Sequence, residues 1–537
     1  MSSGAAWWAA AAVSVWLLVA RSAAQAPVEP GAGAGQQQRQ RQRIDDAVGF
    51  GGLPAAAARG SGADDAAGFG PAAVARDDAA GFGPAAVARD DAAGGGDPSV
   101  AEPAARLTIA GFARAELSGL LERSDSVLRY GRLTLETALT YQREQLSLVA
   151  GVHAETDLIT RWQPGQMRAV ERETNGTWLL PWELYLRYLL GPITLTMGRQ
   201  IAAFGHALFF PLLDVANPRD QRVPLLGVPA ERRLPVWMTR FAIDKAAHRF
   251  ELLAIHEADY RFRPPPFGLY SVVPVLLQRE LDAAHRPLLA QLEQADAVYR
   301  HEGQGVALNA AQALARYRYD GSGLELALYG GWVVQQEGVI GFPAPNDWTR
   351  RPLELPVAHP HYVIVGGSVL SALGPFVTYL EVLGELWRPI ALGDLDAPAP
   401  ALTSQRQTWL RGTLGVRYEG IEDGVLALES TAGVVSPTLQ PAGFAPLLPV
   451  APWSVAGSYR QSFWRQQLEL ELLGLVLGPQ PARGGVAARA QLSYRPFDAI
   501  RVQLAYLCFV ERSGLSVISG FERQRIDASL RWDFAAP

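Results

Sequence analysis

Apolar and polar residues alternate along most of the chain from Arg106 to the C-terminus. Between 132 and 141, for example, Leu133 and Leu135 alternate with Arg132 and Glu136. A period of two places successive side chains on opposite faces of an extended backbone, so the pattern predicts strands with one apolar and one polar face. Seventeen segments show it, at 107–121, 132–141, 145–157, 183–190, 193–199, 235–245, 249–257, 305–319, 323–334, 361–371, 375–388, 406–418, 424–434, 462–475, 486–495, 499–509 and 521–534.

Two architectures are built from such strands. In a soluble sandwich the apolar faces turn inward, whereas in a transmembrane barrel they face lipid and the polar faces line a wet lumen. The barrel is favoured because many segments reach ten residues, Tyr and Trp recur at segment ends, and short connections alternate with long ones. The sequence therefore predicts an all-β fold, a transmembrane antiparallel β-barrel over 104–537. Since single-chain bacterial barrels have an even number of strands, we expect 16, with 18 as the next possibility.

The first hundred residues have a different composition. Residues 5–20 are apolar and are followed by small residues, which predicts a signal peptide over 1–24, with an N-terminal membrane anchor as the alternative. The segment 25–103 is rich in Ala, Gly and Pro and contains the unit DDAAGFGPAAVAR at 64–76 and 77–89. Few large apolar groups are available to offset the entropy cost of ordering it, so we expect a disordered, low-complexity periplasmic segment.

Charge and chemistry exclude several classes of function. The net charge of −5 and the pI of about 6.0 provide no basic surface for nucleic acid. The single cysteine, Cys508, excludes an internal disulfide framework. His359 and His361 could bind a metal, but two histidines without a third ligand are a weak site, so no metal or cofactor is predicted. No G-x-S-x-G or H-E-x-x-H motif occurs, so we predict that the chain is not an enzyme and keep a membrane hydrolase as a remote alternative.

The segment that follows the strand at 193–199 combines aromatic and charged residues in one long connection. Phe209, Phe210 and Pro211 make an apolar step, and charged residues after them can fold the segment back across the lumen. We expect a constriction loop that narrows the pore and sets its selectivity. The alternative is an Asx-type turn with local salt bridges and a structural role only. The candidate residues are Arg199, Gln200, Phe204, Asp214, Asn217, Arg219 and Asp220.

Charged residues on the polar faces of the strands are expected to line the lumen. Both signs occur, so strong selectivity for anions or cations is not indicated, and salt bridges across a filled barrel are the alternative. The candidates are Arg132, Glu136, Arg187, Glu251, Glu325, Glu381, Glu385, Arg411 and Arg417, together with Arg489 and Arg501. The segment 275–299 departs from the period of two and has helical spacing, which predicts a surface helix or a helical plug.

Two stretches carry a resemblance to known outer-membrane proteins. Gly198-Arg199-Gln200, Phe204-Gly205 and the Asn217–Asp220 sequence NPRD resemble a poorly characterised family of Gram-negative, porin-like outer-membrane β-barrels, and the likeness continues through 233–260. The family has Trp where this chain has Phe204. The alternating final segment, which reaches Phe534, resembles the strand that such proteins present to the barrel-assembly machinery.

The resemblance and the strand pattern together imply an outer-membrane channel or transporter for small solutes, surrounded by membrane lipid. A filled barrel with a structural or surface-binding role is the alternative.

Overall fold

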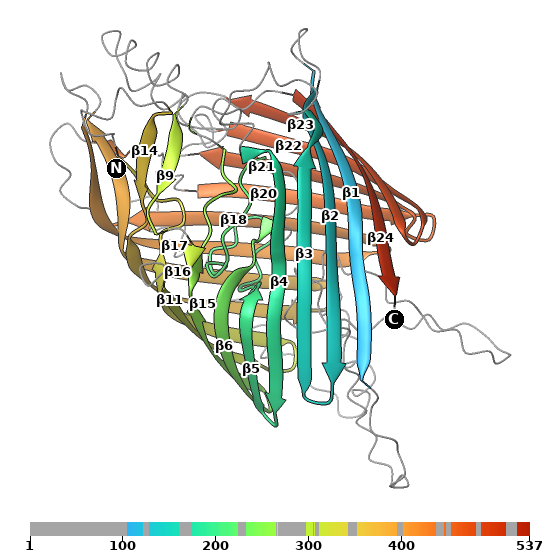
Figure 1. Ribbon diagram of the computed structural model, residues 1–537, viewed down its shortest axis with the longest axis horizontal. Helices are drawn as coiled ribbons and strands as arrows, with labels where there is room; N and C mark the ends of the chain where they lie inside the picture. The colour runs from blue at the N-terminus through green and yellow to red at the C-terminus, as the bar shows by residue number, and fades with distance from the viewer. Residues whose placement is uncertain are drawn as a thin grey trace.

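The alternating segments form strands that pair antiparallel with their neighbours along the chain. β1 (Arg106–Leu120) pairs with β2 (Leu128–Arg143) on one side and with β24 (Gln524–Ala536) on the other, which closes the sheet into a barrel (Figure 1). This computed structural model describes residues 105–121, 128–159, 174–223, 232–264, 266, 297–303, 305–306, 311–341, 352–394, 401–436, 445–446, 453–478, 485–511 and 524–536. The expected signal peptide, the expected disordered segment and residues 275–296 of the expected helix lie outside these ranges.

The main sheet of the described residues contains 19 strands, of which 18 form the wall and one is the two-residue β19. The other wall strands are β3 (Leu146–Asp157), β4 (Thr177–Leu190), β5 (Ile193–Gln200), β6 (Val236–Lys245), β7 (His248–Ile255), β11 (Gln312–Asp320), β12 (Leu324–Val334), β15 (His361–Leu373), β16 (Phe376–Asp394), β17 (Ala401–Ile421), β18 (Gly424–Val435), β20 (Trp453–Phe463), β21 (Leu468–Gly478), β22 (Gly485–Phe497) and β23 (Ile500–Glu511). The short strands are β8 (Glu257–Ala258), β9 (Val298–His301), β10 (Gly305–Val306), β13 (Val339–Ile340), β14 (Glu354–Ala358) and β19 (Ala445–Pro446). β8 pairs with β10, and β19 pairs with β16. A separate small sheet is formed by β9, β13 and β14.

The prediction of 16 strands is wrong, and the structure has the 18 that ranked next. The strand missing from the sequence-based set is β20. Its outward-facing Trp453, Val455 and Tyr459 are interrupted by the small residue Gly457, which shortens the apolar alternation. The turn from β20 to β21 also lacks the residues that usually mark a turn. Trp464, Arg465 and Gln466 all adopt positive φ there, without the Gly, Asn or Asp that usually marks such a turn.

The polarity of the two faces is inverted relative to a soluble sandwich. On β2, Leu133 and Leu135 are 42% and 45% exposed, whereas the alternating Arg132 and Glu136 are 5% and 9% exposed. The outer surface is thus apolar and the charged side chains point into the barrel, as the membrane-barrel prediction required. Among the described residues, no helix is long and apolar enough to span a membrane.

The connections alternate in length, as predicted. Two to four residues join β2 to β3, β4 to β5, β6 to β7 and each later hairpin up to β22–β23, while longer segments join the strands at the opposite end. β1 begins and β24 ends at the end with the short turns. The last residues of the expected helix, Val298 and Tyr299, lie in β9 instead, because they pair with β14.

Candidate functional site: a loop across the lumen

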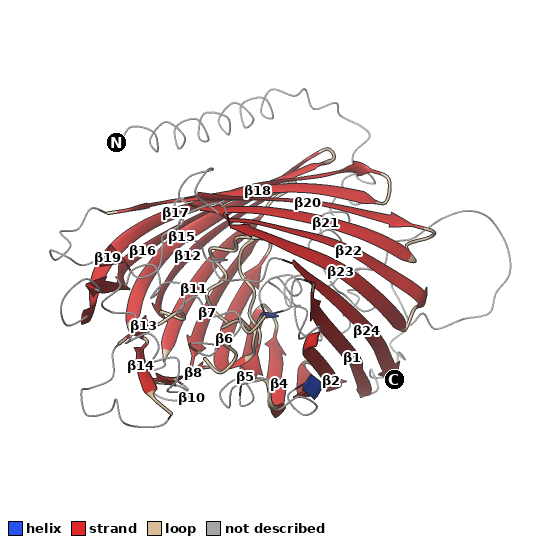
Figure 2. Cartoon of the chain, turned by 90° about the horizontal axis from the view of Figure 1, so that it is seen from above, coloured by secondary structure: helices blue, strands red, loops and turns tan. Residues whose placement is uncertain are grey.

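The long connection between β5 and β6 runs through the inside of the barrel. It leaves the wall at Gln200 and returns at Val236, and residues 201–223 and 232–235 of it are described. Its middle part contacts Glu325 on β12, Glu381 on β16 and Glu429 on β18. β18 lies across the barrel from β5 in the view from above (Figure 2). We call residues 201–216 the crossing loop.

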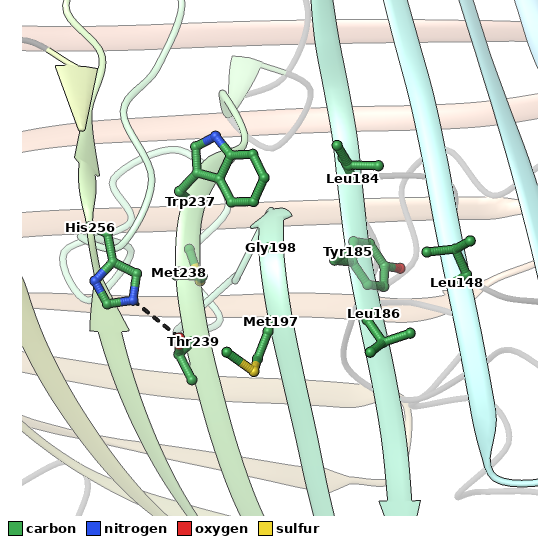
Figure 3. A pocket seen from close by; sticks show the side chains of 10 residues that line it. All are labelled: Leu148, Leu184, Tyr185, Leu186, Met197, Gly198, Trp237, Met238, Thr239 and His256. Carbon is green, nitrogen blue, oxygen red and sulfur yellow. Dashed lines mark hydrogen bonds between the residues drawn. The ribbon is translucent and has the colours of Figure 1, made fainter.

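The backbone conformation of Gly198 turns Arg199 toward the lumen. In the strand register Arg199 lies opposite Leu184 and Trp237, whose side chains are on the outer face. Gly198 has a φ of 129°, which a residue with a side chain rarely adopts, and Arg199 is 5% exposed and points inward. A depression of about 360 Å³ remains on the outer face between Leu184 and Trp237 (Figure 3). The GRQ motif thus places the positively charged side chain of Arg199 in the interior. Strict alternation would have placed this side chain on the lipid-facing surface.

Inside the barrel, Arg199 binds two carboxylates that follow β7 in the chain, one in β8 and one just after it. Its guanidinium donates to Glu257 at 2.9 Å and to Asp259 at 3.5 Å. Glu257 also accepts a hydrogen bond from the main-chain N–H of Trp237 at 2.9 Å. This group fixes the point at which the connection leaves the wall.

Asn217 joins the two ends of the connection. It is fully buried, and its Oδ1 accepts from the N–H of Ala202 at 2.8 Å. Its Nδ2 donates to the carbonyl oxygens of Gln200 at 3.2 Å and Leu234 at 2.8 Å. The side chain of Gln200 donates to the Met238 carbonyl at 3.2 Å, which ties the same point to β6.

Asp214 sits between two guanidinium groups. Its Oδ2 is 2.8 Å from Arg219 and 2.8 Å from Arg233, and Arg219 and Arg233 also form a β-bridge. Burial alone would raise the pKa of Asp214, but the two arginines hold this pKa below its usual value. The ion pairs of Asp214 with Arg219 and Arg233 therefore hold together the end of the connection that returns to β6.

Asp220 belongs to a second network that reaches the wall. Arg222 bridges it to Glu155 on β3, with contacts of 2.7 Å to each carboxylate. Arg132 on β2 lies 3.2 Å from Glu155 and 3.8 Å from Asp220. The structure thus brings the predicted residues Arg132 and Asp220 together, through two residues that the sequence did not single out.

Aromatic residues pack the crossing loop against the wall. Phe204 is buried, meets Tyr329 edge-on at 5.9 Å between ring centroids, and lies 4.8 Å from the guanidinium of Arg316. Phe209 and Phe210 pack against the buried apolar cluster formed by β20–β23. These contacts place the loop against two parts of the barrel wall.

Glu251 is the centre of a charge cluster in the described wall. It is fully buried and contacts Arg240 on β6, Arg249 on β7 at 3.1 Å and Arg316 on β11. One carboxylate is therefore shared by three arginines from three adjacent strands.

The other predicted lumen charges also lie on the inner face. Glu136 is 3.2 Å from His153, Glu325 is 3.1 Å from His206, Glu385 is 2.8 Å from Arg411, Arg417 is 2.7 Å from Glu419, and Arg489 is 2.8 Å from Glu471. Arg187 is half-buried beside the ring of Tyr185, at 5.7 Å. Each of these charged residues has a nearby partner. This arrangement fits both alternatives stated above, charges that line an open lumen and salt bridges that fill the barrel.

The histidines at 359 and 361 diverge. His359 stacks on Tyr260 at 3.5 Å and its Nε2 is 2.9 Å from Nδ1 of His301, whereas His361 stacks on Trp332 at 3.7 Å. Burial and the nearby Arg263 lower the pKa of His301 to about 3, and burial lowers the pKa of His359 to about 4. Within the described ranges, no group of three or more metal-binding side chains occurs.

Comparison with known proteins gives similarities only among solved structures. No family model matches the chain, and no curated protein matches it. The chain is similar to Pseudomonas aeruginosa OpdK with vanillate at 9% identity, covering 80% of this chain and 99% of that one, with a TM-score of 0.46. It is similar to Acinetobacter baumannii OccAB3 at 8% identity, with 81% and 100% covered and a TM-score of 0.45. For Pseudomonas aeruginosa OccK2 (OpdF) in complex with glucuronate the identity is 8%, with 80% and 98% covered and a TM-score of 0.43. The fold of this chain is established by its own strand pairing.

Proposed function

We propose that this protein is an outer-membrane channel or transporter for small solutes, in which the crossing loop narrows the lumen. The observation that supports it is the combination of a closed barrel, an apolar outer surface and a connection between β5 and β6 that runs through the interior. An apolar exterior requires a lipid environment, and closed barrels are the β-structures that satisfy every backbone hydrogen bond there.

The orientation follows from the connections. The short turns and both ends of the barrel sequence lie together, and short turns face the periplasm in barrels of this class. We therefore place residues 25–103 in the periplasm after removal of a signal peptide over 1–24. β24, which contains Phe534 and closes the barrel against β1, is the strand offered to the barrel-assembly machinery.

The candidate selectivity residues are those of the connection and of the inner wall. Arg199, Gln200, Phe204, Asp214, Asn217, Arg219 and Asp220 hold and shape the loop, and the paired charges of the wall set a lumen potential of mixed sign. We assign no catalytic reaction to the chain.

The test is reconstitution of the folded barrel, identified by its resistance to SDS before heating. Planar-bilayer recording is expected to show unitary conductance steps, and liposomes containing the protein are expected to swell in small neutral solutes. A folded, inserted protein that shows neither conductance nor swelling would refute the channel.

A filled barrel with a structural or surface-binding role is the second candidate. It is favoured by the fully buried carboxylates of the inner wall, such as Glu251 and Glu381, because buried ion pairs fill space that a wide pore would leave to water. This candidate predicts flat swelling traces for every solute while the protein remains folded and inserted.

A further inference from the structure

Two carboxylates on the far wall are enclosed by the backbone of the crossing loop. Glu429 on β18 accepts from three consecutive N–H groups, those of Leu208 at 2.7 Å, Phe209 at 3.1 Å and Phe210 at 2.5 Å. It also accepts from the hydroxyl of Tyr379 on β16 at 2.6 Å. The carboxylate is 1% exposed, so these donors replace its water.

Glu381 on β16 is enclosed in the same way. Its Oε1 accepts from the N–H groups of His206 at 2.5 Å and Ala207 at 2.9 Å, and its Oε2 accepts from those of Leu212 at 3.1 Å and Leu213 at 3.4 Å. The side chain is fully buried. Seven main-chain donors of one loop therefore converge on two wall carboxylates.

The sequence of the loop is adapted to this approach. Gly205 has a φ of 82°, and a Cβ at this position would overlap the carboxylate of Glu381. Glycine is therefore needed both for the backbone conformation and for the space that the carboxylate occupies.

The carboxylates and the loop depend on each other. A buried carboxylate is costly unless hydrogen bonds satisfy it, and buried N–H groups are costly unless an acceptor is present. The residues of the NPRD sequence do not supply these contacts, because Asn217 bonds to Gln200, Ala202 and Leu234 at the β5–β6 side of the barrel.

We propose that Glu381 and Glu429 are the positioning residues of the constriction: their negative charges hold the crossing loop over the lumen and thereby set the size of solute that passes. This inference rests on the proposed channel function. It separates two roles within the connection, since the NPRD sequence closes the ends of the loop whereas the two wall carboxylates fix its middle.

The test uses full-length protein with Glu381→Gln, Glu429→Gln and the double substitution. Glutamine keeps the shape but loses the charge, and its NH₂ group faces N–H donors whichever way the amide is turned. The matched control is Glu144→Gln, which removes an exposed carboxylate in the short turn between β2 and β3, outside the lumen. Glu429→Asp, which keeps the charge, is the conservative variant.

Two readouts are combined. Amide hydrogen exchange is expected to accelerate at least about 10-fold at Leu208, Phe209 and Phe210 in Glu429→Gln, because bonds to a charged acceptor are stronger than neutral ones. Exchange in the β2 and β3 amides should stay unchanged. In liposome swelling with a graded series of neutral sugars, the variants Glu381→Gln and Glu429→Gln are expected to admit larger solutes than the wild type. The solute limit should be unchanged in Glu144→Gln and partly restored in Glu429→Asp.

The outcomes distinguish this inference from the channel itself. If the wild type conducts but the double variant keeps both its solute limit and its amide protection, the positioning role is overturned. If the loop amides lose protection while no variant admits any solute, the proposed channel fails and the carboxylates remain anchors of a filled barrel. Should the Gln variants fail to fold, Gly205→Ala, which displaces the loop with both charges intact, is expected to raise the solute limit, and an unchanged limit overturns the inference.

Discussion

Asn217 offers a direct measurement of how firmly the connection is closed. Replacing it by alanine removes three buried hydrogen bonds and leaves the Ala202 N–H and the Gln200 and Leu234 carbonyls without this partner. At a net ~0.5–1.5 kcal/mol for each bond, the substitution destabilises the closed connection by about 3 kcal/mol. That corresponds to roughly 100-fold faster local opening, since each factor of ten equals ~1.36 kcal/mol.

The assay is hydrogen exchange of the amides that the closed connection protects. The N–H of Leu234 donates to the Pro218 carbonyl and the N–H of Asp220 donates to the Arg232 carbonyl, both across the joined ends. Asn217→Asp tests the donor side of Asn217 alone. Aspartate retains the oxygen that accepts from the Ala202 N–H, but replaces the NH₂ group with a second oxygen that faces the Gln200 and Leu234 carbonyl oxygens. Its opening should be at least as fast as that of Asn217→Ala.

The control is Asn175→Ala, a partly exposed position in the turn before β4, which should leave these amides unaffected. Protection in Asn217→Asp equal to that of the wild type would refute the reasoning, because it would mean that the donor side of Asn217 does not hold the loop ends together.

Three further predictions concern other parts of the molecule. Glu251→Gln should destabilise the barrel by about 3–5 kcal/mol, because three arginines lose their shared carboxylate. The measurement is urea unfolding from lipid vesicles, and a change below ~1 kcal/mol would contradict the structural role of the cluster. Gly198→Ala should cost about 1–3 kcal/mol by the same measurement, since its φ is 129° and a Cβ meets backbone atoms, whereas Gly474→Ala, where a Cβ meets open space, should stay within about 0.5 kcal/mol. In the folded protein His301 has a pKa of about 3 and His359 a pKa of about 4, against an ordinary value of 6.5. Between these folded-state values and pH 6.5 the unfolded segment binds more protons than the folded one. Local stability must therefore fall as the pH drops below about 6.5. Exchange of the β9 and β14 amides, corrected for its intrinsic pH dependence, should accelerate from pH 7 to pH 5, and pH-independent protection would oppose this assignment.

The alternation of side chains established an all-β fold, and the length of the segments, the Tyr and Trp at their ends and the alternating connection lengths distinguished a membrane barrel from a sandwich. In the structure Leu133 and Leu135 face outward while Arg132 and Glu136 are buried inside, as expected for a wall whose outer face meets lipid. Alternation also located the short turns, because Gly191-Pro192 and Gly374-Pro375 interrupt it with residues that favour turns. It failed at β20, where Gly457 lies at an outward-facing position and the following turn has no typical turn residue.

The candidate site was only partly accessible from the sequence. The GRQ, FG and NPRD groups marked the right connection, and Phe204, Asp214 and Asn217 lie within it at buried positions. Glu429 carried no signal, because a glutamate on the polar face of one strand looks like any other charge that faces water. Its role depends on three N–H groups about 220 residues away in the chain.

Which side chains each strand of the barrel places outside and inside can be read from the order of its residues, because this follows from the period of two and from the cost of moving charge into lipid. Which charges meet, and where the crossing loop ends, became visible in the folded barrel alone. Both depend on the closure of the barrel, which brings β16 and β18 across from β5, and on the single backbone conformation of Gly198, which turns Arg199 from the lipid side to the lumen.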